Sequence, residues 1–225
     1  MKTIRIITIH TAVLIPIMLG CSTDNQKSDS DTESMDTSET TQQVPWTDYF
    51  VNRSQDDAEE GTNGEVDLTN EDLDLGQLSG FESAKAIGIR FDGIRVAKDQ
   101  KINSAFLQFT MEGNRPKEKP TELTIRAELS ANGESFNEEA KNLSSRELTK
   151  TAVIWSPEPW NPKQADAKRP RTPDLTTIIQ EVVNQEDWQE GNALVLIIKG
   201  TGERDAVSFD GGGKKDGPML RIDAI

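Results

Sequence analysis

The chain of 225 residues carries 39 acidic and 25 basic side chains, which gives a formal net charge of -14. Nucleic-acid binding depends on basic side chains that neutralise phosphates, so this acidity argues against a nucleic-acid partner. It argues equally against docking on anionic lipid, and it favours a neutral or cationic partner or a divalent metal ion.

The first twenty residues have the layout of an export signal. Lys2 and Arg5 precede an apolar run over 6–19, which is shorter than the ~20 apolar residues that span a bilayer. The run ends in Met-Leu-Gly-Cys at Cys21, which resembles the lipobox of bacterial lipoproteins. The resemblance implies that residues 1–20 are a lipoprotein signal peptide and that Cys21 carries the lipid, including palmitate; an ordinary secretory signal is the alternative. We therefore expect anchoring in the bacterial cell envelope, at the outer membrane, with the domain exposed to the periplasm or the exterior.

Processing of this kind removes much of the chemistry open to other chains. It would remove His10, the only histidine, and lipidation would consume the only cysteine. The mature chain then has no Ser-His-Asp or Cys-His nucleophile system, no zinc site with cysteine or histidine ligands, and no disulfide. Carboxylates, lysines and Tyr49 remain for acid–base chemistry, and oxygen ligands remain for a hard cation such as calcium.

Residues 21–45 are dominated by Ser, Thr, Asp and Glu and contain almost no apolar side chains. Such a segment cannot bury enough apolar surface to offset the entropy of ordering. Repulsion between its charges favours extension. We therefore expect an acidic, disordered tether that holds the domain away from the membrane.

Residues 46–225 have the composition of a globular domain, of a size that suits one core. Short alternating or apolar runs recur between turn signals, as they do in antiparallel sandwiches. The apolar run at 193–200 predicts a central strand buried on both faces. The fold class expected is an all-β, antiparallel, jelly-roll-like β-sandwich, with strands near 49–54, 64–69, 86–91, 102–112, 122–130, 151–155, 193–200, 205–210 and 219–223.

One short amphipathic helix is expected near 173–185. Thr172 can cap it, Pro173 suits its first position, and Asp174 suits the positive end of the helix dipole. Apolar side chains then recur with helical spacing and form one stripe, at Leu175, Ile178, Ile179, Val182 and Val183.

The order of these parts resembles a known type of domain. A strand with "WSPEPW" is followed by the helix "RTPDLTTIIQEVVNQ", then by "DWQEGNALVLIIKG" and finally by "PMLRI". This order, over residues 49–224, resembles the DNRLRE type of β-sandwich, which occurs in disaggregatase-like and polysaccharide-degrading proteins. Because some of its members are carbohydrate-binding modules, the resemblance implies a domain that binds polysaccharide.

The acidic stretch near the first strands is a candidate cation site. Like charges this dense repel one another unless a cation or water lies between them. One interpretation is a structural calcium site that joins the first strands to a later loop; the other is a solvated acidic loop in which Asp57 and Asp72 cap turns. The spacing is not that of an EF-hand. The candidate ligands are Asp56, Asp57, Glu59, Asp72, Asp74 and Asp210.

The tryptophans and one lysine are the candidates for contact with a ligand. Trp155 ends an alternating strand, which predicts burial, whereas Trp160 lies between two prolines and is expected on an exposed loop that could stack on a sugar ring. The alternative for Trp160 is a cover over the core edge, and the alternative for Trp188 is that it folds back on the helix that precedes it. Lys214 lies in a glycine-rich stretch between two strands, which we interpret as a hairpin loop that borders a binding face.

These observations favour an envelope lipoprotein whose β-sandwich binds polysaccharide without catalysis. The alternative is a structural or protein-interaction lipoprotein that uses the same face to hold an envelope protein. A carboxylate-based glycan lyase or hydrolase is a third hypothesis, although no spacing in the sequence places two carboxylates across a scissile bond.

Overall fold

The structure is a computed structural model that describes residues 46–76, 84–163 and 169–225. All of them belong to one unit, Gln42–Ile225. The predicted signal peptide, lipobox and acidic tether lie outside the described residues, so their assignment stays a prediction.

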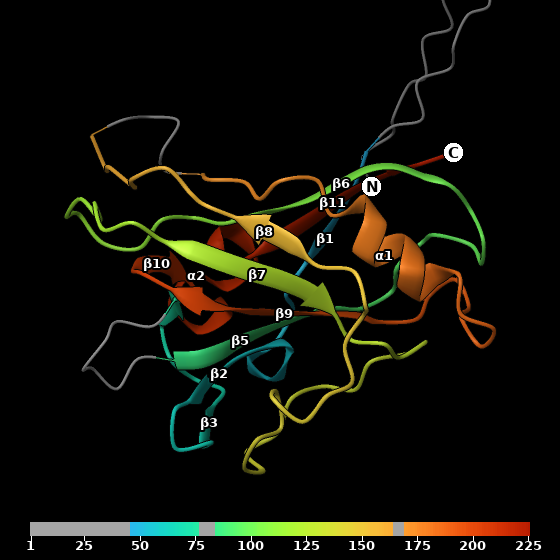
Figure 1. Cartoon of the computed structure of the whole chain (residues 1–225), viewed down its shortest axis with the longest axis horizontal. Helices are drawn as coiled ribbons and strands as arrows, with labels where there is room; N and C mark the ends of the chain where they lie inside the picture. The colour runs from blue at the N-terminus through green and yellow to red at the C-terminus, as the bar shows by residue number, and fades with distance from the viewer. Residues whose placement is uncertain (1–45, 77–83, 164–168) are drawn as a thin grey trace, which may run out of the picture. The chain divides into compact units, whose positions relative to one another are not determined.

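The larger sheet has six antiparallel strands (Figure 1). Its two central strands, β5 and β9, pair over Ile87–Phe91 and Leu194–Ile198. β2 pairs with β5 on one side and β7 pairs with β9 on the other. In spatial order the strands are β3 (Val66–Asp67), β2 (Asp57–Gly61), β5 (Ala84–Phe91), β9 (Leu194–Thr201), β7 (Glu122–Ala127) and β8 (Val153–Trp155).

Two smaller antiparallel sheets complete the layers. One has the order β1 (Thr47–Phe50), β11 (Met219–Ala224) and β6 (Ile102–Gln108), and the other pairs β10 (Arg204–Val207) with β4 (Asp72–Leu75). Their inward side chains join those of the larger sheet in one apolar core. The prediction of an all-β, antiparallel, sandwich-like fold is therefore confirmed.

The strand β9 is buried on both faces, as its continuous apolar run predicts. Leu194, Leu196 and Ile198 face the main core, whereas Val195 and Ile197 face a second, smaller cluster that contains Phe136. This cluster lies so close to the sheet that a Cβ atom on Gly88 would come within 2.5 Å of the Phe136 ring. The loop that carries Phe136 therefore covers the outer side of the larger sheet.

The predicted helix is present but shorter than expected. The helix α1 spans Thr176–Val183, and the apolar stripe predicted for it is fully buried. Thr172 does not cap the helix: its hydroxyl accepts a hydrogen bond from the backbone of Leu107 at 3.1 Å, while Asp174 accepts one from the backbone of Thr176 at 3.3 Å. Thr172 is thus used to hold the segment before the helix against β6.

The glycine-rich stretch is a helix and not the predicted hairpin loop. The helix α2 spans Phe209–Asp216, its first turn is capped by Ser208, whose hydroxyl accepts from the Gly211 backbone at 3.1 Å, and Gly213 kinks it with a φ of 59°. The strands on its two sides do not pair, because β10 pairs with β4 and β11 pairs with β1 and β6. The hairpin prediction is therefore wrong.

The acidic stretch after β1 is also more regular than expected. A 3-10 turn, η1 (Ser54–Asp56), leads directly into β2, and β4 follows after the short β3. In β4 the side chains of Leu73 and Leu75 enter the core, while those of Asp72 and Asp74 stay half-buried. Strand pairing in this stretch fixes where each carboxylate points.

The first and last strands of the domain lie side by side. β1 pairs with β11 from Thr47 opposite Ile222 to Phe50 opposite Met219. Across this pair Arg221 makes two bonds to the Asp48 carboxylate, at 2.5 and 2.7 Å. Within the described residues, no helix has the length and apolar character needed to cross a membrane.

Candidate functional site

The pair of tryptophans at 155 and 160 belongs to the core. Trp155 is 5% exposed, which confirms its predicted burial, and Trp160 is 2% exposed, which contradicts the predicted platform. Trp160 is buried because its backbone pairs with that of Lys117. The Trp160 nitrogen lies 3.2 Å from the Lys117 carbonyl oxygen, and the Lys117 nitrogen lies 2.9 Å from the Trp160 carbonyl oxygen. The bridge turns the proline-flanked segment into a short strand-like pair that directs the indole inwards.

Trp188 is buried, whereas Lys214 is exposed. Trp188 is 2% exposed and its indole N–H donates to the Val96 carbonyl at 2.9 Å, so it is a core residue and not a ligand contact. Lys214 is exposed on α2, and its ammonium lies 5.2 Å from the centre of the Phe50 ring. Of the three predicted ligand-contacting residues, Lys214 alone has an exposed side chain.

Three of the predicted cation ligands, Asp56, Asp57 and Asp210, lie near the start of β2 and accept hydrogen bonds from protein groups. Asp210 accepts from the Ser54 hydroxyl at 2.9 Å. Asp56 accepts hydrogen bonds from Arg53 and Arg90 at 3.1 and 2.8 Å. Asp57 accepts from the backbone of Phe209 at 2.7 Å. Burial, and then the nearby charges of Asp210 and Asp56, raise the pKa of Asp57 to about 7 against that hydrogen bond. These carboxylates therefore join β2 to the start of α2 through hydrogen bonds.

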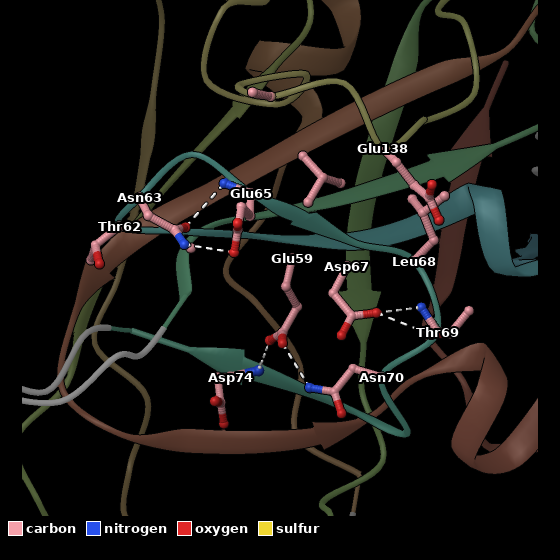
Figure 2. Close-up of a pocket in the computed structure, with 13 residues that line it drawn as sticks. Glu59, Thr62, Asn63, Glu65, Asp67, Leu68, Thr69, Asn70, Asp74 and Glu138 are labelled. Carbon is pink, nitrogen blue, oxygen red and sulfur yellow. Dashed lines mark hydrogen bonds between the residues drawn. The ribbon is translucent and has the colours of Figure 1, made fainter.

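Of the other three, Glu59 and Asp74 line a pocket beside β2, β3 and β4, whereas Asp72 does not line it. The pocket has a volume of about 650 Å³ and is drawn in Figure 2. Carboxylates, amides and hydroxyls dominate its lining, and the remaining contacts are apolar. Its polar side chains belong to Glu59, Thr62, Asn63, Glu65, Asp67, Thr69, Asn70, Asp74 and Glu138.

Glu59 lies at the back of this pocket and holds β2 to β4. One of its oxygens accepts from the backbone of Asp74 at 2.5 Å, and the other accepts from the Asn70 amide at 2.7 Å (Figure 2). Burial raises the pKa of Glu59 to about 7, although both hydrogen bonds lower it. Burial, followed by the charges of Asp72 and Asp205, raises the pKa of Asp74 to about 6.

The turns on either side of β3 contribute much of the lining of the pocket. The Asn63 amide donates to Glu65 at 2.7 Å, and Asp67 accepts from the Thr69 backbone at 2.8 Å. Both contacts hold polar side chains in defined directions before any ligand arrives. Glu138 reaches the pocket from the loop that covers the second apolar cluster.

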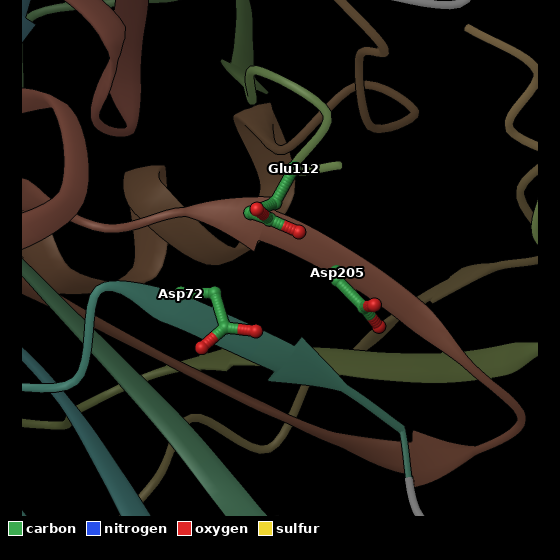
Figure 3. A group of neighbouring side chains, drawn as sticks. All are labelled: Asp72, Glu112 and Asp205. Atoms are coloured by element: carbon green, nitrogen blue, oxygen red, sulfur yellow. The ribbon is translucent and has the colours of Figure 1, made fainter. Parts of the chain in front are cut away.

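A separate group of carboxylates lies on the outer face of the β4–β10 sheet. Asp72, Glu112 and Asp205 each offer an oxygen within 4.8 Å of the other two, in the arrangement that Figure 3 shows. Asp72 was predicted as a ligand, whereas Glu112 and Asp205 were not. They meet because Met111 bridges Ala206 and because β10 pairs with β4.

This trio is chemically able to hold a hard cation, since oxygen ligands at such spacing suit calcium. A protein cation already lies beside it: the Lys117 ammonium contacts Asp205 and is 2.8 Å from Glu203. Burial lowers the pKa of Lys117, but hydrogen bonds with Asp205 and Glu203 outweigh it and raise that pKa. Lys117 therefore neutralises part of the charge that a metal ion would neutralise.

Comparison with known proteins adds no family to these observations. No protein-family model matches the chain, and no curated protein matches it. The resemblance to DNRLRE-type domains stays a prediction that rests on the order of the sequence blocks.

Proposed function

We propose that the protein is a bacterial envelope lipoprotein whose β-sandwich binds polysaccharide in the pocket beside β2, β3 and β4, without catalysis. The observation that carries this proposal is the lining of that pocket, in which amides and carboxylates are already oriented by hydrogen bonds. Its volume of about 650 Å³ is typical of small-molecule sites, which span roughly 300–1,000 Å³.

The lining suits the chemistry of a sugar. The hydroxyls of a glycan can donate to the free lone pairs of Asp67 and Glu138, and they can accept from amide groups such as that of Asn70. Leu68 and Val66 offer apolar contacts to the C–H face of a ring. Side chains that are fixed before binding lose little entropy when the ligand arrives, which favours affinity.

Glu59 and Asp74, whose pKa values are raised by burial, do not support catalysis. Both oxygens of Glu59 accept hydrogen bonds from within the protein, so that group supports the walls of the pocket. Asp74 is the residue of β4 whose backbone N–H donates to the Glu59 carboxylate, whereas a glycosidase needs its two carboxyl groups on opposite sides of the scissile bond. We therefore favour capture of the glycan over its cleavage.

Calcium remains part of the proposal as a structural ion. The place favoured for it is the trio of Asp72, Glu112 and Asp205, whose oxygens lie close enough together to share one ion. Such an ion would join β4, β10 and the segment after β6.

A glycan array tests the proposal directly. The chain from residue 22 to residue 225 should be retained by at least one envelope or environmental polysaccharide, and the Asp67→Asn/Glu138→Gln variant should lose that retention. The matched control is Glu139→Gln, because Glu139 is an exposed neighbour of Glu138 that does not line the pocket. Equal retention of the double variant would remove the pocket as the site. Absence of retention on every glycan would leave the protein-interaction hypothesis ahead.

A further inference from the structure

The outer face of the β1–β11–β6 sheet differs from the rest of this acidic molecule. Tyr49 and Val51 of the first strand region point into the core, so the alternating positions Trp46 and Phe50 point outwards. Phe106 of β6 lies on the same side, with its ring 5.6 Å from that of Trp46. We call this surface the Trp46 face, and it comprises Trp46, Phe50, Phe106, Arg171, Lys214, Met219 and Arg221.

The aromatic rings of the Trp46 face support basic groups. The guanidinium of Arg171 lies 4.9 Å from the centre of the Phe106 ring, and the ammonium of Lys214 lies 5.2 Å from that of Phe50. Their stems therefore rest on apolar surface while both charged side chains stay exposed.

Two carboxylates on or beside this face form ion pairs, whereas Asp223 of β11 accepts only a hydrogen bond from the Asn103 amide at 3.4 Å among the described residues. The Asp48 carboxylate accepts hydrogen bonds from Nε and Nη2 of Arg221, and Asp216 on α2 forms an ion pair with Arg169 at 3.1 Å. The acidic pocket and the trio of Asp72, Glu112 and Asp205 lie on other strands. Arg171 and Lys214 thus make this face less acidic than the chain as a whole, although the Asp223 carboxylate opposes them.

The same part of the domain carries two of the three exposed large apolar side chains among the described residues; the third, Ile154, lies on β8. Trp46 is 41% exposed, and Ile225, which follows the strand that pairs with β1, is 56% exposed. Exposed rings beside basic groups are the composition found where proteins meet a membrane interface. Trp46 is also the first described residue after the 24 residues that separate it from the proposed lipid anchor at Cys21.

From these observations we propose that the Trp46 face docks the domain on an anionic phospholipid surface. The proposal departs from two expectations of the sequence analysis, namely that the net charge of -14 disfavours anionic lipid and that the tether holds the domain away from the membrane, because the charge of this face differs from that of the whole chain. Trp46 enters the headgroup region, while Arg171 and Lys214 contact lipid phosphates. A contact of this kind is weak by itself, at about 1 kcal/mol for each basic side chain near the surface. The anchor raises the local concentration of the face at the membrane, so weak contacts are sufficient. The inference rests on the proposed lipid anchor and not on glycan binding.

The experiment uses the single thiol of the chain. Residues 21–225 are coupled through Cys21 to a maleimide phospholipid in vesicles that contain brominated acyl chains, which quench nearby indoles. The other three tryptophans are buried, so Trp46 is the exposed reporter. We expect its emission to be quenched on vesicles rich in phosphatidylglycerol, and much less on pure phosphatidylcholine. A Trp46→Phe variant should lose the quenching, which identifies the reporter.

The variant Arg171→Ser/Lys214→Ser keeps the reporter and removes the charges. The equilibrium constant for docking, measured by the quenching of Trp46, should fall about fivefold for each basic side chain removed. The control Lys150→Ser/Ile154→Ser removes one exposed basic and one exposed apolar side chain at β8 and should behave as the wild type does.

Three outcomes would overturn the proposal: no quenching on either lipid, equal quenching on both, or quenching that survives the loss of Arg171 and Lys214. Retention of the uncoupled chain on an anionic polysaccharide through these residues, without quenching on vesicles, would assign the face to a glycan instead. The pocket variant Asp67→Asn/Glu138→Gln should be quenched normally, so failure of the proposed glycan pocket and failure of membrane docking are distinguishable.

Discussion

The indole ring of Trp160 lies 6.3 Å from that of Trp155, centre to centre, at an interplanar angle of 45°. Trp155 in turn stacks on Phe109, with ring centres 5.8 Å apart and an angle of 11°. The three rings form a continuous aromatic row that joins β8 and the following loop to the segment after β6. Neither tryptophan is available to a ligand without unfolding part of this row.

Trp155→Ala and Trp160→Ala should therefore destabilise the domain by similar amounts, about 3–5 kcal/mol each, the range for truncation of a large buried aromatic side chain. Their effects should be less than additive, because each change also removes the ring pair. Urea unfolding of both single variants and the double variant measures this. A Trp160→Ala variant as stable as the wild type would contradict the position of its ring.

The stability of the domain should depend on the protonation of Asp57. Its carboxylate is buried beside Asp56 and Asp210, so the folded chain holds this proton up to a pH of about 7, whereas the unfolded chain releases it near 3.8. The contribution to stability is therefore complete below about pH 4 and is lost as the pH rises through about 7.

Asp57→Asn removes this titration and keeps one oxygen for the Phe209 backbone. At pH 8 it should raise the free energy of unfolding by about 1–3 kcal/mol, less than the full shift implies at 1.36 kcal/mol per pKa unit. Between pH 4 and pH 8 the free energy of unfolding of this variant should also depend less on pH than that of the wild type. If the free energy of unfolding changes equally with pH in both proteins, Asp57 does not titrate between pH 4 and pH 8.

Calcium, if it binds the trio of Asp72, Glu112 and Asp205, should raise the melting temperature, because a ligand held only by the folded state stabilises it by mass action. Excess chelator should reverse the increase. Glu112→Gln should abolish the response to calcium while the protein stays folded, and Glu118→Gln, a change in the exposed loop after Glu112, serves as the control. The same melting curve with calcium and with chelator would exclude the site.

The lipid anchor predicts a requirement for Cys21. With a cleavable secretory signal in place of residues 1–20, the wild-type chain should not acquire lipid, whereas the native signal should lead to palmitate labelling. Cys21→Ser behind the native signal should abolish the label. Palmitate on the Cys21→Ser chain would mean that lipid is attached elsewhere, and no label on the wild type would favour an ordinary secretory signal.

The parts of the fold that follow from local sequence pattern were predictable. The alternation in β6 and β7 and the apolar run of β9 each reflect burial that neighbouring residues in the chain already encode. The stripe of α1 was equally clear, but its start was not, because the hydrogen bond between Thr172 and Leu107 joins residues 65 positions apart.

The geometry of the candidate site depends on strand pairing that the local sequence pattern does not predict. Asp72 and Asp74 lie in β4, where aspartate and leucine alternate as expected for a half-buried strand. The many charged residues around this segment obscure the pattern. Glu112 and Asp205 come together only through the register of β10 with two other segments. Trp160 shows the same limit, since its flanking prolines indicate a loop and its bridge to Lys117 decides which way the ring points.

The pairing of β1 with β11 also governs when the domain can fold. The bond between Asp48 and Arg221 joins positions 173 residues apart, and β1 is an edge strand whose partner in its sheet is β11. A nascent chain emerges with β1 long before β11 exists, so the three-stranded sheet cannot close until synthesis is nearly finished. Contacts of such long sequence separation slow folding. A chain that folds late stays unfolded for longer during synthesis, which would be compatible with the export in an unfolded state that the predicted signal peptide implies.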